Sequence, residues 1–298
     1  MSSAPTTTRL PRYRRAATEV SCVVTQRDLE ILKTVQNFRL VASADIQALA
    51  IGSKQGILRR LQKLYHAGYL DRVPPRRSKD GGSAPMVYAV TNKGIRTLQK
   101  EGRVDCVTST DWNAQNRSQG DLFVDHTLLV SRIRTVFTLA SRPGSGRELA
   151  FWREGRELLD RVEVALDRGY VSAPIAPDAF FSTRHAKGRS NFFLEADRGT
   201  MTIARFMLKL RAYAAYFAEK KHEVKHGIKF FRVLTVAHSR TRGMHLAEGA
   251  AALEALRRHR RLFLFTDASS MSLEHPESVL EKIWTIPGES GLTSLAGS

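Results

Sequence analysis

The sequence predicts a two-domain α/β protein, in which a small basic helical domain precedes a larger domain of strands and helices. The length of 298 residues suits two domains of ordinary size. The apolar fraction of 42% and the aromatic fraction of 8% are typical of a globular protein. The first third of the chain has helical apolar spacing, whereas short apolar strands recur after residue 120.

Positive charge is concentrated in the first third of the chain. Residues 1–100 hold 18 Lys and Arg against 6 Asp and Glu, a net charge of +12 out of +18 for the whole chain. This distribution indicates a domain that binds a polyanion. Residues 1–20 are poor in acid and rich in Arg, Ser and Thr, and we expect them to form a disordered basic arm that lies along phosphates.

Cysteine usage and hydropathy predict a cytoplasmic protein with no membrane partner. Cys22 and Cys106 lie far apart and form no CxxC pair, which argues against a zinc ribbon and a disulfide framework. No apolar run approaches the roughly 18 residues that span a bilayer. The N-terminal segment lacks the hydrophobic stretch of a secretory signal.

Residues 21–102 have the element order of a winged helix-turn-helix. Thr25 and Asp28 have the spacing of a capping box, and apolar residues follow at helical spacing. Ser43 is expected to cap the second helix and Thr91 the last one. Helices are predicted over 26–38, 44–49, 54–66 and 92–100, and the wing is predicted as strands 69–73 and 86–90 with loop 74–85.

The third helix and the wing carry the predicted DNA contacts. Ile57, Leu58, Leu61 and Leu64 are predicted to form the buried stripe of this helix, so its other face points outward. The outward face would lie nearest the groove, and the basic, glycine-containing loop suits contacts with backbone phosphates. The alternative is a helix-turn-helix that contacts proteins. The predicted DNA-binding residues are Lys54, Gln55, Arg59, Lys63, Arg76, Arg77 and Lys79.

A second domain is predicted over residues 121–287, after a polar linker over 103–120. A disordered tail is predicted over 288–298. The first helix of this domain should bury an apolar side that runs from Leu122 to Ala140. The elements expected in this domain are a helix over 121–140, a strand over 149–153, an irregular segment to 168, a strand over 171–183, a second hairpin strand from 190, a helix that begins after 200, a strand over 230–237, a helix over 244–257 and a strand over 262–267.

Three acidic residues lie on the predicted hairpin. Glu195 and Asp197 are two residues apart, so they share one face of a strand with about 6 to 7 Å between them. The hairpin can bring Asp178 beside Glu195. The helix that follows is predicted to bury a face that begins with Ile203 and to carry Arg205, Lys209 and Tyr216 on a stripe that flanks this face. Such an acidic strand end can hold a divalent metal, or it can be a plain strand-turn-helix.

This order of elements, with P-D on one hairpin strand and E-x-D on the next, resembles the restriction-endonuclease-like αβββαβ core of the PD-(D/E)xK nuclease superfamily. The resemblance implies Mg²⁺, or alternatively Mn²⁺, held by Asp178, Glu195 and Asp197. Asp197 stands where the superfamily has a lysine and cannot supply its positive charge. Lys209 is the expected substitute and completes the predicted catalytic set of Asp178, Glu195, Asp197 and Lys209, with Arg205 second. The alternative is that Lys209 and Arg205 neutralise Glu195 and Asp197 as structural ion pairs.

The whole chain also resembles the replication-relaxation family of plasmids and integrative elements. The resemblance rests on TQRDLEILKTV, VYAVTNKGI, DHTLLVSRIR and PDAFF followed by FFLEADRGT. It implies a DNA-binding protein that acts in replication, relaxation or mobilisation by metal-dependent nicking or cleavage. Double-stranded DNA is the expected partner, and a second copy in a homodimer and other DNA-processing proteins of the element are further candidates. The rival is a non-catalytic transcriptional or replication regulator with a degenerate nuclease-like domain.

Two histidines, His222 and His226, are spaced four residues apart in the segment EKKHEVKH. This spacing occurs in metal sites, but no HExxH motif accompanies it. We therefore predict a solvated helix end here. The absence of GxxxxGK[ST] and GxGxxG sequences argues against a nucleotide-driven activity.

Overall fold

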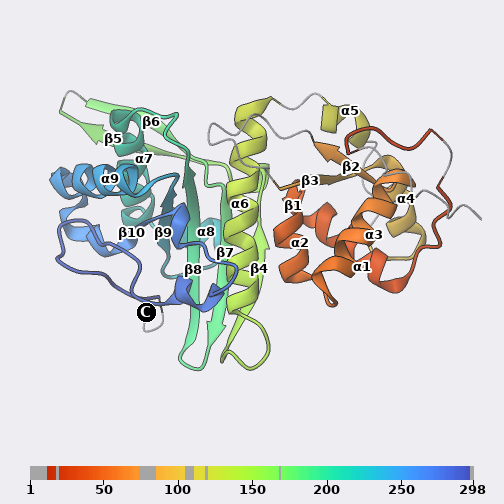
Figure 1. The fold of residues 1–298 in the computed structure, drawn as a ribbon. Coiled ribbons are helices and arrows are strands. Elements are labelled where there is room, and N and C mark those ends of the chain that lie inside the picture. Colours follow the sequence, from red (N-terminus) through yellow and green to blue (C-terminus); the bar gives the residue numbers. More distant parts are fainter. Residues whose placement is uncertain are drawn as a thin grey trace, which may run out of the picture. The chain divides into compact units, whose positions relative to one another are not determined.

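The computed structural model describes residues 12–17, 20–73, 85–104, 111–117, 120–167 and 169–295. The fold is mixed α/β, as predicted, and it divides into two compact units, Met1–Ser131 and Arg132–Ser298. In Figure 1, unit 1 is drawn in red, orange and yellow, and unit 2 mainly in green and blue. Over these ranges, no helix combines the length and the apolar character that crossing a membrane requires.

Unit 1 consists of short helices and a three-stranded antiparallel sheet with the strand order β1-β3-β2. Its core is formed by apolar side chains of the helices and strands, among them the fully buried Leu32, Val35 and Leu61. The elements are α1 (Gln26–Phe38), β1 (Val41–Ala42), α2 (Ser43–Leu49), α3 (Lys54–His66), β2 (Leu70–Val73), β3 (Val87–Val90), α4 (Asn92–Lys100), α5 (Trp112–Arg117) and the first part of α6 (Asp121–Ala140).

Capping side chains determine where three helices of unit 1 begin. Thr25 and Asp28 form the predicted capping box, in which Thr25 N donates to Asp28 Oδ2 at 2.7 Å. Ser53 and Thr91 cap α3 and α4, because each hydroxyl accepts from a backbone N–H three residues later. The predicted boundaries of these helices are confirmed.

Three predictions about individual residues of unit 1 were wrong. The N-cap of α2 is Ala42, because β1 leads directly into the helix and Ser43 N donates to Met86 O across the sheet at 2.7 Å. Leu58 is 43% exposed, since it projects about 100° away from the buried Ile57 around the helix. Leu122 is 67% exposed and lies in the first turn of α6, ahead of the buried positions of that helix.

A buried ion pair joins α1 to α3. Asp28 has no exposed surface, and Arg60 Nε donates to its Oδ1 at 2.7 Å while a second guanidinium nitrogen contacts Oδ2. Burial raises the pKa of Asp28, but the hydrogen bonds from Arg60 and Thr25 outweigh burial, and the pKa lies below its ordinary value. The two-point contact therefore fixes the packing of the two helices.

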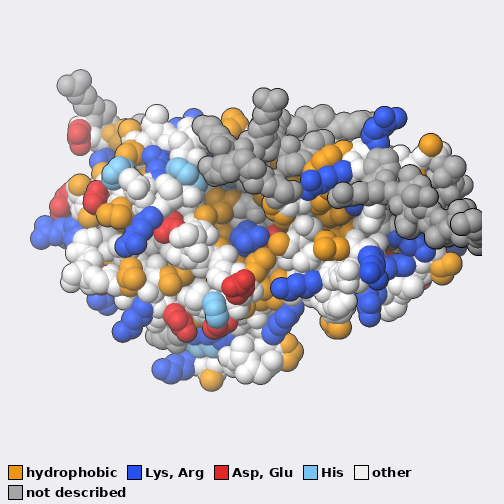
Figure 2. Space-filling view, in the orientation of Figure 1, with side chains coloured by type: hydrophobic (Ala, Val, Ile, Leu, Met, Phe, Trp, Pro, Cys, Tyr) orange, Lys and Arg blue, Asp and Glu red, His pale blue; other side chains and the backbone are white. Residues whose placement is uncertain are grey.

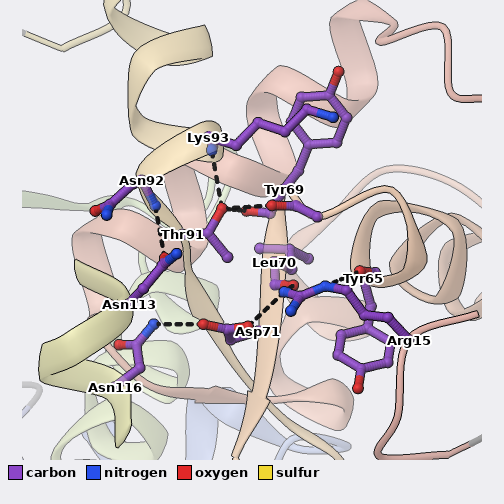
Figure 3. A network of polar contacts seen from close by, with 12 residues as sticks. Arg15, Tyr65, Tyr69, Leu70, Asp71, Thr91, Asn92, Lys93, Asn113 and Asn116 are labelled. Atoms are coloured by element: carbon purple, nitrogen blue, oxygen red, sulfur yellow. Dashed lines mark hydrogen bonds and ion pairs between the residues drawn. The ribbon is translucent and has the colours of Figure 1, made fainter. Parts of the chain in front are cut away.

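Two segments that the sequence predicted to be a disordered arm and a linker are folded onto β2 (Figure 3). Arg15 donates to Leu70 O at 3.0 Å and to Asp71 Oδ1 at 2.5 Å. Asn116 of α5 donates to Asp71 Oδ2 at 3.3 Å and to Val90 O at 2.9 Å. Residues 12–17 and α5 are ordered because Asp71 and the strand carbonyls supply acceptors for them. Residues 288–295 of the predicted disordered tail are also ordered, because Thr293 N donates to Trp284 O at 2.7 Å and Leu295 is fully buried. Outside the described residues lie 1–11 and 18–19 of the predicted arm, 74–84 of the predicted wing, 105–110 and 118–119 of the predicted linker, and 296–298 of the predicted tail.

Unit 2 contains a five-stranded mixed sheet with the order β10-β9-β8-β7-β4 (Figure 1). Strands β8, β9 and β10 are parallel, and β7 is antiparallel to both of its neighbours. The elements are the second part of α6, β4 (Arg147–Arg153), η1 (Arg156–Leu158), β5 (Asp160–Leu166), β6 (Gly169–Ile175), β7 (Ala179–His185), β8 (Gly188–Asp197), α7 (Ile203–Ala218), α8 (Lys221–His226), β9 (Arg232–Ala237), α9 (Arg240–Ala252), η2 (Glu254–Leu262), β10 (Phe263–Asp267), η3 (Ala268–Ser270) and η4 (Pro276–Leu280).

Helices cover both faces of the sheet in unit 2. On one face, Phe137 of α6 packs against Phe181 and Phe192, with ring centroids 4.7 and 6.5 Å apart. On the other face, Phe193 packs against Tyr213 of α7 at 5.7 Å, and α9 contributes further apolar side chains to the same core. Strand β8 is therefore buried on both faces, which explains why side chains from 192 to 197 are buried in either direction.

The stretch 171–183, predicted as one strand, forms parts of two strands in different sheets. Asp178 lies in the break between β6 and β7, next to Pro177, which has no backbone N–H for a ladder. Strand β6 pairs with β5, which occupies a segment predicted to be irregular. In β5, buried Val162 and Val164 alternate with exposed neighbours, and this alternation is the sequence signal for the strand. The β5–β6 hairpin packs against α7.

Helix α7 has a different buried face from the predicted one. Ile203, predicted to be buried, is 41% exposed in the first turn. Tyr216, predicted to flank the buried face, is fully buried, and its hydroxyl donates to Asp160 Oδ2 at 3.0 Å. The hairpin β5–β6 covers this side of the helix and thereby widens its buried face.

The histidine segment forms a separate short helix that is buried on its His222 side, while Glu223, Val224 and Lys225 are exposed. Lys220 has φ 55°, which ends α7 and allows the separate helix α8 to begin. His222 is 1% exposed, and its ring nitrogens lie 3.3 Å from the carbonyl oxygens of Tyr216 and Lys229. Burial lowers the pKa of His226 to about 4, so this ring is neutral at pH 7.

The last predicted helix begins and ends earlier than expected. Helix α9 spans Arg240–Ala252, because Ser239 caps it by accepting from Arg242 N. The residues expected to extend it form the 3-10 segment η2, which is kinked at His259. The strand predicted after it is confirmed as β10.

Candidate functional site

Strand β8 ends in two carboxylates that are almost completely buried. Glu195 is 3% exposed and Asp197 is 7% exposed, because β8 is the central strand of the sheet. A buried carboxylate must be protonated or paired, since an unpaired charge in the interior costs several kcal/mol. The partners of these two side chains therefore define the chemistry of the site.

Helix α7 supplies both partners of Glu195. Lys209 Nζ forms an ion pair with Glu195 Oε2, and the Tyr213 hydroxyl donates to Glu195 Oε1 at 2.5 Å. Lys209 and Tyr213 are four residues apart, so they project from the same face of the helix. Lys209, the expected substitute for the strand lysine, thus reaches the strand. Arg205, the second candidate, is exposed.

Asp178 lies beside Glu195, directly before the adjacent strand β7 begins. Asp178 N donates to Leu194 O at 2.9 Å, and its Oδ2 accepts from Ala196 N at 2.7 Å. The next residue, Ala179, is paired with Leu194, so the hairpin register brings Asp178 next to Glu195. The structure therefore brings together three of the four predicted catalytic residues: Asp178, Glu195 and Lys209.

Asp197 is bound to a different helix. Its Oδ2 accepts from Arg242 Nε of α9 at 2.8 Å and from Gly199 N at 3.1 Å, and its Oδ1 accepts from a second nitrogen of Arg242 at 3.3 Å. Gly199 has φ 74°, a conformation that favours glycine and lets the chain turn back after β8. Arg242 also donates to Met201 O at 2.7 Å. Asp197 and Arg242 therefore hold the turn between β8 and α7.

The two ends of the Glu195–Lys209 pair differ in their proton affinity. Burial raises the pKa of Glu195 to about 7, with Asp178 adding to this effect and with Lys209 and Tyr213 opposing it. Burial lowers the pKa of Lys209, but the carboxylates of Glu195 and Asp178 outweigh burial, and the pKa lies above its ordinary value. Lys209 is therefore charged, while Glu195 gains or loses its proton near neutral pH.

The oxygens of the predicted metal ligands are already used by protein donors. Among the residues that the structure describes, no three Asp, Glu, His or Cys side chains are grouped so that they could hold a metal ion. Both oxygens of Glu195 are engaged by α7, and both oxygens of Asp197 are engaged by Arg242. A hard divalent ion needs about six oxygen ligands. The carboxylates of Glu195 and Asp197 are thus held by protein donors, and metal binding stays a prediction.

In unit 1, the outer face of α3 holds the predicted DNA-binding residues. Lys54, Gln55 and Arg59 are exposed, and Lys63 is half-buried in the last turn. Within the described parts of the chain, Lys54 and Arg59 form no ion pair, whereas Arg60 is bound to Asp28. In Figure 2, Lys and Arg side chains recur over the visible face of unit 1 with little red among them. Arg76, Arg77 and Lys79 lie outside the described residues.

A family model described as replication-relaxation matches residues 32–233, about two thirds of the chain. The chain belongs to the replication-relaxation family. This membership indicates a role in the replication or relaxation of plasmid or mobile-element DNA. No curated protein and no solved structure matches the chain.

The region matched to the replication-relaxation family contains the α3 face and the Glu195 site, but it ends before Arg242. The sequence did not single out Tyr213 or Arg242 as partners of the acids. Tyr213 has a usable signal, because it follows Lys209 by four residues on one helix. Arg242 has no such local signal in the sequence, since 45 residues separate it from Asp197.

Proposed function

We propose that this replication-relaxation protein binds double-stranded DNA through a winged helix formed by α1 to α4 and β1 to β3. Antiparallel β2 and β3 flank residues 74–84, as the two strands of a wing do, and β1 completes the sheet. One observation carries the proposal: Lys54, Gln55 and Arg59 are exposed on α3, opposite its buried stripe, and the described residues provide no partner for their side chains.

The outer face of α3 has the residue types that read a major groove. Arg forms bidentate contacts with guanine, Gln forms them with adenine, and Lys holds phosphates or guanine. Leu58, 43% exposed, lies on the same face and suits an apolar contact with a thymine methyl group. In this proposal, α3 enters the major groove. The residues assigned to the backbone phosphates are Lys63, Arg76, Arg77 and Lys79.

We further propose that unit 2 is a nuclease-like domain that does not cleave DNA. The order α6, β4, β7, β8, α7, β9 supports a relation to the αβββαβ core of PD-(D/E)xK nucleases. The contacts of the acids support a structural role, because Lys209 and Tyr213 hold Glu195 while Arg242 holds Asp197. The protein would then act as a replication or transcription regulator of the element.

Metal-dependent nicking is the second candidate, and one contact favours it. Lys209 lies on Glu195 beside Asp178, where a nuclease of this kind requires a positive charge. In this candidate, Glu195 would bind the metal through the lone pairs that Lys209 and Tyr213 leave open, since each of its oxygens accepts one of these contacts.

Fluorescence anisotropy with a labelled duplex at several salt concentrations tests the DNA-binding proposal. Lys54→Gln with Arg59→Gln removes two cations from α3, and Arg96→Gln with Lys100→Gln removes two exposed cations from α4 as the matched control. We expect the α3 variant to bind at least about tenfold more weakly, because each lost base contact contributes about 1–3 kcal/mol. The salt slope should fall by no more than about 0.9, the share of the single phosphate contact that Lys54 can make. Unchanged duplex binding in the α3 variant, or an equal loss in the control, would refute the assignment of α3.

A plasmid-nicking assay with Mg²⁺ or Mn²⁺ tests the role of unit 2. We expect supercoiled plasmid to remain intact with the wild-type protein and with Glu195→Ala, while duplex binding is retained. Metal-dependent nicking by the wild type that Glu195→Ala abolishes would overturn the non-catalytic assignment and establish the nuclease.

A further inference from the structure

A cationic pocket lies in unit 2, where the beginning of β8 runs beside the beginning of β9. Its volume is about 200 Å³, and Arg189, Asn191, Lys229, Phe230 and Arg232 contribute to its lining. Asn191 precedes Glu195 by four residues on the same strand, which corresponds to about 13 Å. The pocket is therefore separate from the acid–lysine cluster at the other end of β8.

The positive charge of this pocket has no counterpart in its lining. Arg189, Lys229 and Arg232 line it together with no acidic residue. Across the described ranges, none of these three cations forms an ion pair. Glu148 pairs with Arg184, and Glu289 pairs with Arg261. The lining therefore leaves the three cations without a protein counter-charge.

Arg232 is the most enclosed of the three cations. Its Nε is buried and has no hydrogen-bond partner among the described residues, and the same holds for Asn191 Oδ1. Burial lowers the pKa of Arg232, and Arg261 lowers it further. Buried polar atoms are normally satisfied, so these two atoms can take a further hydrogen-bond partner at the pocket.

Phe230 adds an aromatic surface to the same pocket. Its side chain is 48% exposed, although phenylalanine is usually buried. Phe217 supports it from one side, with ring centroids 5.8 Å apart at an interplanar angle of 85°. An exposed aromatic ring beside cations is the arrangement on which unpaired nucleobases stack while their phosphates are held.

We propose that this pocket binds a nucleotide unit of a single strand, with its phosphate among Arg189, Lys229 and Arg232 and its base against Phe230. Pockets for whole drug-sized ligands have volumes of about 300–1,000 Å³. This pocket is smaller, and its volume suits one phosphate group. A duplex keeps its bases stacked inside, so only an unpaired base can reach the ring. The site adds a single-strand contact to the duplex contact proposed for α3. A free nucleotide offers the same phosphate and base as a nucleotide within a single strand, and the competition experiment below distinguishes these two ligands.

The test measures binding of a labelled oligothymidine of about twelve nucleotides, a length within the range of single-strand sites. All proteins carry Lys54→Gln and Arg59→Gln, so that α3 does not contribute. Arg189→Gln with Lys229→Gln changes the pocket, and Arg258→Gln with Lys282→Gln removes two exposed cations elsewhere in unit 2 as the matched control.

We expect the pocket variant to bind oligothymidine about tenfold more weakly, with a salt slope lower by about 0.7, since the pocket holds one phosphate and each phosphate of a single strand contributes about 0.7. The control variant should bind as the parent does. Phe230→Leu keeps an apolar side chain but removes the ring, and it should weaken binding about fivefold or more without changing the salt slope.

Competition identifies the source of the nucleotide. A single strand is the ligand if unlabelled oligothymidine displaces the labelled strand and thymidine monophosphate at equal nucleotide concentration does not. A free nucleotide is the ligand of the same pocket if both competitors displace the labelled strand equally. Unchanged binding in the pocket variant, an equal loss in the control, or equal displacement by polyglutamate would overturn the proposal. Duplex binding by the protein with an intact α3 is measured separately, so failure of either proposal is distinguishable from failure of the other.

Discussion

Replacing Lys209 by Met tests whether the acid–lysine cluster is a structural element of unit 2. The substitution removes the charge and keeps a side chain of similar length, so Glu195 retains only Tyr213 as a partner. The side chains of Lys209 and Glu195 are 18% and 4% exposed. Removing one partner of a buried ion pair costs about 3–5 kcal/mol, and we expect a loss of this size in the unfolding free energy at about pH 8.

The loss should depend on pH, because Glu195 can take up a proton. In the wild type, burial raises the pKa of Glu195 from 4.5 to about 7. The folded state then binds more protons than the unfolded state between these two values, so the stabilising contribution is complete below about pH 4.5 and is lost as the pH rises through 7. At 1.36 kcal/mol for each pKa unit, the change is about 3 kcal/mol. Without Lys209 the pKa rises further, so the variant should be destabilised strongly near pH 8 and little near pH 5.

Urea unfolding at about pH 5 and about pH 8, followed by the fluorescence of the buried Trp284, measures the effect. The double variant Lys209→Met with Glu195→Gln is the control, because it leaves no unpaired charge in the interior. It should recover most of the stability lost at the higher pH. The reasoning fails if Lys209→Met is as stable as the wild type near pH 8, or if its loss is the same at both pH values.

Three further perturbations test the contacts around the candidate sites. Arg242→Ala leaves Asp197 buried without its guanidinium partner, so urea unfolding of unit 2 should show an unfolding free energy lower by about 3–5 kcal/mol. Arg242→Lys should recover only a part of this free energy, because Lys cannot make the two-point contact. Gly199→Ala places a Cβ at φ 74° and should lower the unfolding free energy by about 1–2 kcal/mol in thermal unfolding; an unchanged melting temperature would show that the turn tolerates a side chain. Burial raises the pKa of Asp28, but the hydrogen bonds from Arg60 lower it overall, so its stabilising contribution is present above about pH 4 and is lost as the pH falls through the lower folded value. Asp28→Asn should therefore flatten the acid limb of the stability curve measured by circular dichroism, and an acid limb as steep as in the wild type would contradict this.

Local signals in the sequence predicted much of unit 1 and the centre of unit 2. The helices that begin after Thr25, Ser53 and Thr91 were predicted correctly, because a side chain next to each helix satisfies its first N–H groups. The hairpin between β7 and β8 follows from its short connection, and its register places Asp178 beside Glu195. These features depend on residues within a few positions of one another, so the sequence contains the necessary information.

Contacts between distant segments were not predictable in the same way. Residues 12–17 and α5 appear polar and irregular in the sequence, yet Arg15 and Asn116 both bind Asp71 of β2. Strand β5 was missed because its alternation is short and its partner strand was assigned to the main sheet. For Arg15 and Asn116 the acceptor Asp71 lies at least 45 residues away in the sequence, and no local pattern identifies it.

The sequence by itself determined that β8 carries Glu195 and Asp197 on one face and that α7 follows with Lys209, because strand alternation and helical spacing are local properties. Only the tertiary structure decided the partners of the two acids. Lys209 and Tyr213 reach Glu195 across the turn, whereas Asp197 is held by Arg242 from α9. The physical reason is that a buried carboxylate takes whichever donors the packed helices bring to it, and helix packing is settled by the whole core of unit 2.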